Sequence, residues 1–167
     1  MNYASGTNVG EERSRAGLQF LLEKFGADQF GYAVDRTSNS AKIMFRFKGA
    51  NFVFRLPLTR RDDKRIRFTP SGKLRVNAQV DQLILDEDRR RWRALCLAVK
   101  AMLVGVEEGI FDFGEVFMPY LVWGDGRTTA ETLLPAVEGH LKSGEPLPPM
   151  IHSGRLLQAL PRPEDGQ

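Results

Sequence analysis

The first periodic pattern along the chain is that of a helix. Four apolar residues have the i, i+3, i+4, i+7 spacing of a single helix face: Leu18, Leu21, Leu22 and Phe25. Gly26 follows, at the position where a glycine commonly ends a helix. The small and polar residues 1–10 precede this pattern, and we expect them to form a flexible N-terminal arm.

The next segments alternate apolar and polar residues with a period of two. Phe30, Tyr32 and Val34 alternate with small or polar residues, and the runs 42–48 and 52–56 continue the alternation after short polar turns. Alternation of this kind predicts an antiparallel meander of three strands.

The same alternation separates aromatic from cationic side chains. On the second strand, one face has Ile43, Phe45 and Phe47, and the other has Met44 together with the cations Lys42, Arg46 and Lys48. Arg55 adds a cation on the third strand. A slip of one residue in register would bury the lysines, so the register is well determined. We expect the helices to cover the aromatic face of the sheet and to leave a basic face open.

A segment dense in positive charge follows the third strand. Residues 59–80 contain seven Lys or Arg: Arg60, Arg61, Lys64, Arg65, Arg67, Lys73 and Arg75. Pro70 and Gly72 lie among them, and we expect an exposed basic loop. Within it, residues 66–68 could pair with 74–76 as a hairpin.

The clearest helical pattern comes next. Its apolar stripe runs through about four turns and contains Trp92, Leu95, Cys96, Val99, Met102, Leu103 and Val106. Asp86 or Asp88 is expected to cap this helix, which would place Arg89, Arg90, Arg91 and Arg93 in its first turns. Cations at the positive pole of a helix cost about 0.3–1 kcal/mol each. Their position therefore favours a role other than helix stability.

The remaining third of the chain is predicted to add smaller elements and a tail. Residues 115–123 could form a strand, or a short helix leading into one, and Pro119 would place that strand at an edge. Thr128 and Glu131 form a capping-box pattern that opens a last helix. The Pro-rich segment 143–167 is expected to be an irregular tail.

Together these elements predict one α+β domain over residues 11–142. It has an N-terminal helix, a three-stranded antiparallel meander, a long helix that is basic at its start and apolar beyond, an extra edge strand and a C-terminal helix. A length of 167 residues with 42% hydrophobic and 27% charged residues is typical of a single globular domain.

Composition also bears on where the protein works. The single cysteine, Cys96, leaves no internal disulfide and is typical of a reducing compartment. No apolar run approaches the ~18 residues of a membrane span, and residues 1–8 lack the features of a secretion signal. We expect a cytoplasmic protein without membrane contacts.

Charge is distributed very unevenly along the chain. Residues 42–100 hold sixteen Lys or Arg against six Asp or Glu, a net +10, whereas 1–41 carry −1 and 101–167 carry −6. A patch of this density repels itself and usually binds a polyanion. The candidate nucleic-acid-binding residues are Lys42, Arg46, Lys48, Arg55, Arg60, Arg61, Lys64, Arg65, Arg67, Lys73, Arg75, Arg89, Arg90 and Arg93.

Two other interpretations of this charge remain open, namely a solvated surface balanced by the acidic flanks and a surface for an acidic protein. Trp92 could stack on a base, but its place in the apolar stripe favours the core. Trp123 lies beside a turn, where exposure is more common.

Other chemistry has little support in the sequence. The carboxylates of residues 62–63, 81 and 86–88 are better explained by capping and ion pairing than by a magnesium site. His140 and His152 are the only histidines, no zinc-ligand spacing exists, and no phosphate-binding glycine motif occurs. We expect no catalytic residue, no metal site and no cofactor, and hence not an enzyme.

Two stretches carry a resemblance to a known family. The first is the arginine–tryptophan segment 89–95 with its continuation through Lys100 to Ile110, and the second is the turn 124–128, Gly-Asp-Gly-Arg-Thr. Over residues 11–150 the chain resembles small proteins encoded by bacteriophages and prophages. It departs from their pattern at Gly114, where an acidic residue is more usual. The resemblance implies a phage context and no active site.

The order of elements also resembles other folds, without a shared residue motif. A helix, three antiparallel strands and a helix with a basic start are similar to double-stranded-RNA-binding domains and to the core of single-strand-annealing recombination proteins. Element order alone does not determine function.

These observations predict a phage-encoded, non-enzymatic protein that binds DNA or RNA, with single-stranded DNA favoured, through backbone contacts of low sequence specificity. Its role would lie in DNA metabolism or recombination, as a single-strand-binding or annealing protein. The alternative is an interaction protein that inhibits a host nucleoprotein complex of defence. Opposite charges at the centre and flanks could also drive homo-oligomer assembly.

Overall fold

The computed structural model describes residues 10–144, and it has the predicted α+β class. Its elements are α1 (Glu11–Phe25), β1 (Gln29–Asp35), β2 (Ser40–Phe47), β3 (Ala50–Pro57), α2 (Lys64–Arg67), α3 (Asn77–Glu107), α4 (Phe113–Phe117), the 3-10 helix η1 (Met118–Tyr120) and α5 (Thr129–Ser143). Residues 1–9, which belong to the predicted flexible N-terminal segment, and residues 145–167, which make up most of the predicted tail, lie outside the described residues.

The three strands form the antiparallel meander that alternation predicts, in the order β1-β2-β3. Ile43 pairs with Phe54 and Lys42 pairs with Arg55, so each face keeps its own residue type across the sheet. The turn between β2 and β3 has Lys48 and Gly49 at φ 49 and 79. Positive φ at both central residues matches the twist of a two-residue hairpin.

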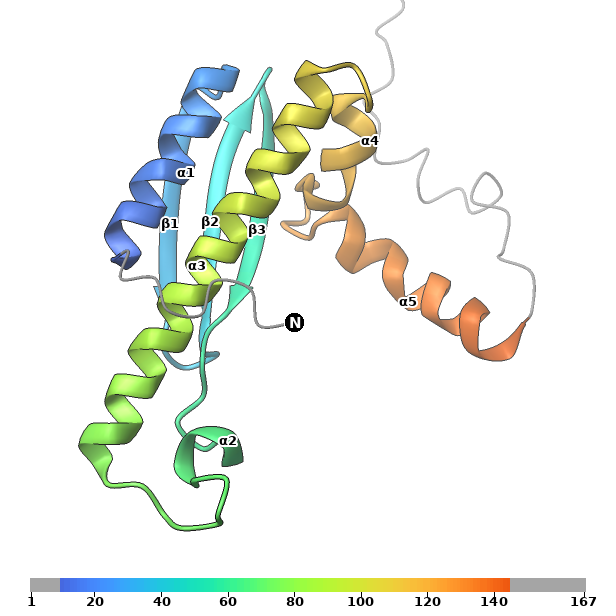
Figure 1. Ribbon diagram of the computed structural model, residues 1–167. Helices are drawn as coiled ribbons and strands as arrows, with labels where there is room; N and C mark the ends of the chain where they lie inside the picture. The colour runs from blue at the N-terminus through green and yellow to red at the C-terminus, as the bar shows by residue number, and fades with distance from the viewer. Residues whose placement is uncertain (1–9, 145–167) are drawn as a thin grey trace, which may run out of the picture.

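The hydrophobic core lies between one face of the sheet and the helices α1 and α3, which pass in front of the strands in Figure 1. Ile43, Phe54, Leu18, Trp92 and Val99 are all buried there. The prediction that helices cover the aromatic face is therefore confirmed, and so is the place of Trp92 in the core. Gly26 ends α1 in the left-handed conformation, also as predicted.

The long helix differs from its prediction at the N-terminal end. α3 begins at Asn77 and runs for 31 residues, or about 46 Å at 1.5 Å per residue. Asp86 and Asp88 therefore lie inside the helix and do not cap it. The arginines at 89–93 lie near its middle, where the helix dipole does not act on them, so the argument from misplaced charge is wrong.

The first half of α3 packs against the preceding loop to form a projection that we call the arm, residues 58–91. Figure 1 shows α2 and this half of α3 extending beyond the end of the sheet. Ile66 of α2 and Val80 of α3 are buried apolar residues within it, and Leu58 at its base is buried with the main core. The expected loop 59–80 is thus shorter and partly helical, and the expected hairpin is reduced to a bridge between Phe68 and Leu74.

The C-terminal elements cover one end of the core. Phe117 of α4 is fully buried, and its ring lies 4.5 Å from that of Phe113. The expected edge strand over 115–123 is instead α4 and η1 followed by single bridges at Leu121 and Val122. α5 begins with the predicted capping box at Thr128 and projects away from the sheet (Figure 1).

Candidate nucleic-acid interface

The open face of the sheet carries the first group of candidate cations, and two of them are already paired. Arg46 donates from Nε and Nη2 to the Asp28 carboxylate at 2.8–3.1 Å. This hydrogen bonding lowers the pKa of Asp28. Arg55 forms an ion pair of 2.7 Å with Glu131 at the start of α5.

The other two candidates predicted for this face are less constrained. Lys42 is exposed on it. Lys48 instead lies in the hairpin turn after β2, with its Nζ 5.2 Å from the ring centroid of Phe47. On the same face, a shallow hollow of about 430 Å³ is lined in part by Gly31, Met44 and Val53. The open face therefore combines apolar surface with cations, two of which are paired with carboxylates.

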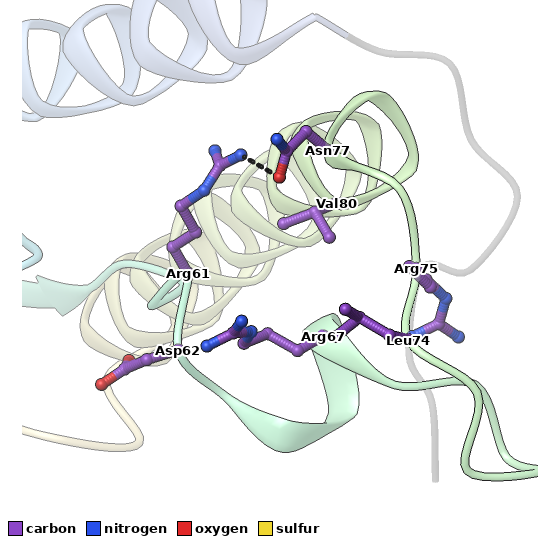
Figure 2. Close-up of a pocket in the computed structure, with 7 residues that line it drawn as sticks. All are labelled: Arg61, Asp62, Arg67, Leu74, Arg75, Asn77 and Val80. Carbon is purple, nitrogen blue, oxygen red and sulfur yellow. Dashed lines mark hydrogen bonds between the residues drawn. The ribbon is translucent and has the colours of Figure 1, made fainter.

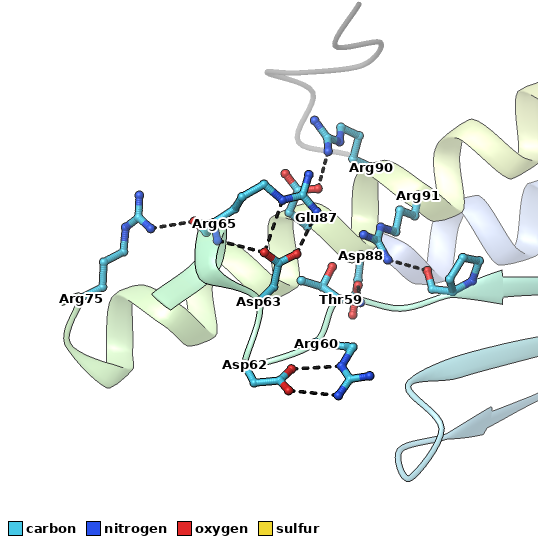
Figure 3. Close-up of polar contacts among 11 residues, drawn as sticks. Thr59, Arg60, Asp62, Asp63, Arg65, Arg75, Glu87, Asp88, Arg90 and Arg91 are labelled. Atoms are coloured by element: carbon cyan, nitrogen blue, oxygen red, sulfur yellow. Dashed lines mark hydrogen bonds and ion pairs between the residues drawn. The ribbon is translucent and has the colours of Figure 1, made fainter. Parts of the chain in front are cut away.

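The arm gathers the second group of candidates, where carboxylates lie among the arginines. Arg60 pairs with Asp62 at 3.0 Å, and Arg65 pairs with Asp63 at 2.8 Å, as Figure 3 shows. The Asp63 carboxylate also accepts the Arg65 backbone N–H at the start of α2. The Arg65 hydrogen bonds lower the pKa of Asp63.

Arg61 and Arg75 hold the two sides of the arm together. Arg61 makes an ion pair with Asp81 of α3, so it links the loop to the helix. Arg75 Nη1 donates to three backbone carbonyls, those of Arg65 at 2.9 Å, Ile66 at 3.1 Å and Phe68. Carbonyls at the end of α2 have no partner within that helix, and Arg75 satisfies them.

At the base of the arm, two contacts that the sequence did not suggest hold the outgoing and returning chain segments together. The buried carboxylate of Asp88 accepts the backbone N–H of Thr59 at 2.8 Å. Arg91 Nη1 donates to the carbonyl oxygen of Pro57 at 2.7 Å (Figure 3). We call this pair of contacts the clasp, because both chain segments that enter the arm pass through it.

The candidates in the middle of α3 are mostly paired within the helix. Arg89 is bound to Asp86 at 3.2 Å, and Arg90 is bound to Glu87, both at i,i+3 spacing. Arg93 differs from them, because its Nη1 is buried without a hydrogen-bond partner in the described structure. Such an unsatisfied donor is costly in a folded protein.

The fourteen candidates therefore fall into three groups. Seven are held in ion pairs, and Arg75 is bonded to carbonyls. Six have no hydrogen bond or ion pair from their side chains within residues 10–144: Lys42, Lys48, Lys64, Arg67, Lys73 and Arg93. Lys64, Arg67 and Lys73 all lie in the arm, which therefore holds half of these six cations.

No group of three or more His, Cys, Asp or Glu side chains is placed to hold a metal ion among residues 10–144. Within that range, none of the helices is both long and apolar enough to cross a membrane. Trp123 is partly exposed, and its indole N–H donates to Thr129 Oγ1 at 2.9 Å.

Comparisons with protein-family models, with curated proteins and with solved structures found no match for this chain. The resemblance to phage-encoded proteins therefore stays a prediction.

Proposed function

We propose that this protein binds nucleic acid through the arm, by contacts to the phosphate backbone. The observation that supports the proposal is the concentration of available cations there. Lys64 and Lys73 are exposed and have no carboxylate partner among residues 10–144, and Arg67 is available beside them. Lys and Arg that are not already neutralised are the groups that release counterions when they meet phosphates.

The paired arginines would contribute in a different way. Arg60 and Arg65 are exposed, at 68% and 81% for their side chains, and each bonds a carboxylate only two residues away. Exposed ion pairs contribute about 0–1 kcal/mol, so a phosphate can replace the carboxylate at little cost. Backbone contacts of both kinds carry no sequence information, so we propose low sequence specificity.

The biological setting that we propose follows the resemblance described above. A phage-encoded protein with a basic arm and no catalytic role would act in DNA metabolism or recombination, as a single-strand-binding or annealing protein in the host cytoplasm. Single-stranded DNA is the ligand we favour, and self-assembly along the strand is compatible with it.

The decisive experiment changes only the available cations of the arm. In Lys64→Gln/Arg67→Gln/Lys73→Gln, anisotropy titrations with labelled single-stranded DNA, duplex DNA and RNA should show weaker binding than the wild type. The slope of log K against log salt should become shallower by about 2–3, because each lost phosphate contact removes ~0.7–0.9.

A matched control removes the same charge elsewhere on the described surface. Arg13→Gln/Lys24→Gln/Lys100→Gln also loses three exposed cations, from α1 and the second half of α3. It should bind nearly as the wild type does. Equal loss of affinity in both triple variants would show that the net charge of the protein, and not the position of the cations in the arm, determines binding.

One observation favours the alternative, a protein that binds a host nucleoprotein complex. Leu134 and Leu141 of α5 are 50% and 75% exposed, and a helix with uncovered leucines is typical of protein interaction surfaces. A pull-down from nuclease-treated lysate tests it. Retention of one specific protein by the wild type, and its loss in Leu134→Gln/Leu141→Gln, would support the alternative.

A further inference from the structure

A cavity lies inside the arm, between its loop and the start of α3. Figure 2 shows the residues around it, and its volume is about 290 Å³. The lining combines three guanidinium groups, one carboxylate, one amide and two apolar side chains, from Arg61, Arg67, Arg75, Asp62, Asn77, Leu74 and Val80.

Two of the guanidinium groups border the cavity on different sides. In Figure 2 the side chains of Arg61 and Arg67 extend along two of its edges. Arg67 makes no side-chain hydrogen bond or ion pair with the rest of the described chain. Arg61 is bound through Nη1 to Asp81 and through Nη2 to Asn77, the latter at 3.3 Å. One cation is thus available, and a second is held by a single carboxylate.

The negative group in the lining is largely neutralised. Both oxygens of Asp62 accept hydrogen bonds from Arg60, each at 3.0 Å, and these bonds lower the pKa of Asp62. Asn77 is also the first residue of α3, whose N-cap residue Val76 makes no side-chain hydrogen bond. The uncapped amides of the first turn add partial positive charge on the same side.

We propose that this cavity binds the terminal phosphate of a nucleic-acid strand. This inference rests on the proposed function and specifies what the arm recognises. A terminal phosphate monoester carries about −1.5 to −2 charges at pH 7, whereas an internal phosphodiester carries one. The monoester therefore competes better with Asp81 for Arg61 and can also engage Arg67.

The shape and the apolar lining agree with a strand end. Val80 is buried, and with Leu74 it gives the cavity an apolar side against which the terminal sugar can pack. A continuous backbone would have to enter and leave the arm, whereas an end has only to enter it.

The test compares oligonucleotides that differ only at one end. Anisotropy is measured with strands of equal length that carry either a phosphate or a hydroxyl at the 5′ end, with the label at the 3′ end, and with the converse pair. The wild type should bind one phosphorylated form about tenfold more tightly than its hydroxyl partner, a ratio that corresponds to about 1.4 kcal/mol.

Two variants test whether the difference in affinity between phosphorylated and hydroxyl ends arises in the cavity. Arg67→Gln should reduce the ratio between phosphorylated and hydroxyl ends to near one. Lys73→Gln removes a cation of the same arm that does not line the cavity, and it should lower both affinities while keeping the ratio. Equal affinity of the wild type for phosphate and hydroxyl at both ends would overturn the inference and leave backbone binding intact.

A second measurement covers the case in which no strand binds. Titration with inorganic phosphate is followed by NMR at the Arg67 side chain and the Val80 amide. Saturable shifts there without oligonucleotide binding would overturn the assignment to a strand end and the proposed function together, and would leave a site for a free phosphate. No shift and no end preference would overturn the site itself.

Discussion

The role of Asp88 depends on a contact that is distant in sequence. It lies inside α3, yet it is buried and accepts the backbone N–H of Thr59, 29 residues earlier. A carboxylate of this kind costs free energy to bury unless it is hydrogen-bonded. Its removal would leave a buried backbone donor without a partner.

We predict that Asp88→Ala lowers the free energy of unfolding by about 1.5–3 kcal/mol, the range for a hydrogen bond to a charged group. Asp88→Asn keeps an acceptor oxygen and should lose less. Asp86→Ala is the matched control, since Asp86 is exposed and pairs with Arg89 on the same helix; we expect a change within ~0.5 kcal/mol. Urea unfolding measures all three, and equal losses for Asp88→Ala and Asp86→Ala would contradict this account.

Cys96 gives a second prediction at this scale. The thiol is half-buried beside Gly17 of α1, and burial raises its pKa. Because the thiolate is the reactive form, Cys96 should react with a disulfide reagent more slowly at pH 8 in the native protein than in urea. Equal rates in the two conditions would show that the thiol is freely accessible.

Among the elements, α3 has two halves with different surroundings. Trp92, Val99 and Leu103 are buried against the sheet and α1, whereas in the first half Val80 is the buried apolar residue, facing the arm loop. Local stability follows the amount of buried apolar contact. The helix is continuous, but its ends depend on different parts of the molecule.

Hydrogen exchange should detect this difference. We predict that amides at 80–87 exchange faster than amides at 95–103, and that Ile66→Ala speeds exchange at 80–87 with little effect at 95–103. The physical reason is that Ile66 is buried in the arm and does not belong to the main core, so its removal weakens the arm alone. Uniform protection along α3 would mean that arm and body unfold as one unit.

α5 depends on its first turn in a similar way. Thr128 Oγ1 accepts the Glu131 N–H at 3.2 Å, and Glu131 Oε2 accepts the Thr128 N–H at 2.9 Å. We predict that Thr128→Ala costs α5 about 1 kcal/mol, seen as faster amide exchange over 132–142 only. Glu138→Ala, in the same helix, is the control and should leave exchange unchanged.

The same turn gives α5 a dependence on pH. The backbone N–H of Thr128 and then Arg55 lower the pKa of Glu131. Because this pKa is lowered, the ionised carboxylate stabilises the start of the helix at pH values above the usual glutamate pKa of about 4.3. This contribution is lost as the pH falls through the lowered pKa. Protection of α5 should therefore fall on acidification below about pH 4, and Glu131→Gln should remove that dependence.

For the whole molecule, the pairing of its own charges limits how it can bind a polyanion. If all fourteen candidate cations each met one phosphate of a duplex, the slope of log K against log salt would be about −13 at ~0.9 per contact. Only six have no carboxylate or carbonyl partner in the described structure. We predict a slope no steeper than about −5. When an arginine leaves a carboxylate to bind a phosphate, the carboxylate takes up a cation from the salt, and this uptake offsets the counterion that the phosphate releases. A measured slope near −13 would show that the ion pairs do not persist in solution.

The sequence predicted what depends on local periodicity. Alternation gave the register of the sheet, Trp92 was placed in the core, and Thr128 with Glu131 marked the start of α5. Contacts between distant residues were missed. The carboxylates at 86–88 resembled a helix cap because Thr59, the partner of Asp88, is not near it in sequence. Arg55 resembled a cation available for a ligand because its partner, Glu131, lies 76 positions later.

The clasp has a consequence for how this chain can change over time. The chain leaves the body after Pro57 and returns near Asp88, and the clasp holds these two points together. Everything between them can be lengthened, shortened or exchanged without moving the sheet, provided that α3 changes by whole turns of about 3.6 residues. Relatives of this protein should therefore share the body and differ in the length and sequence of the arm.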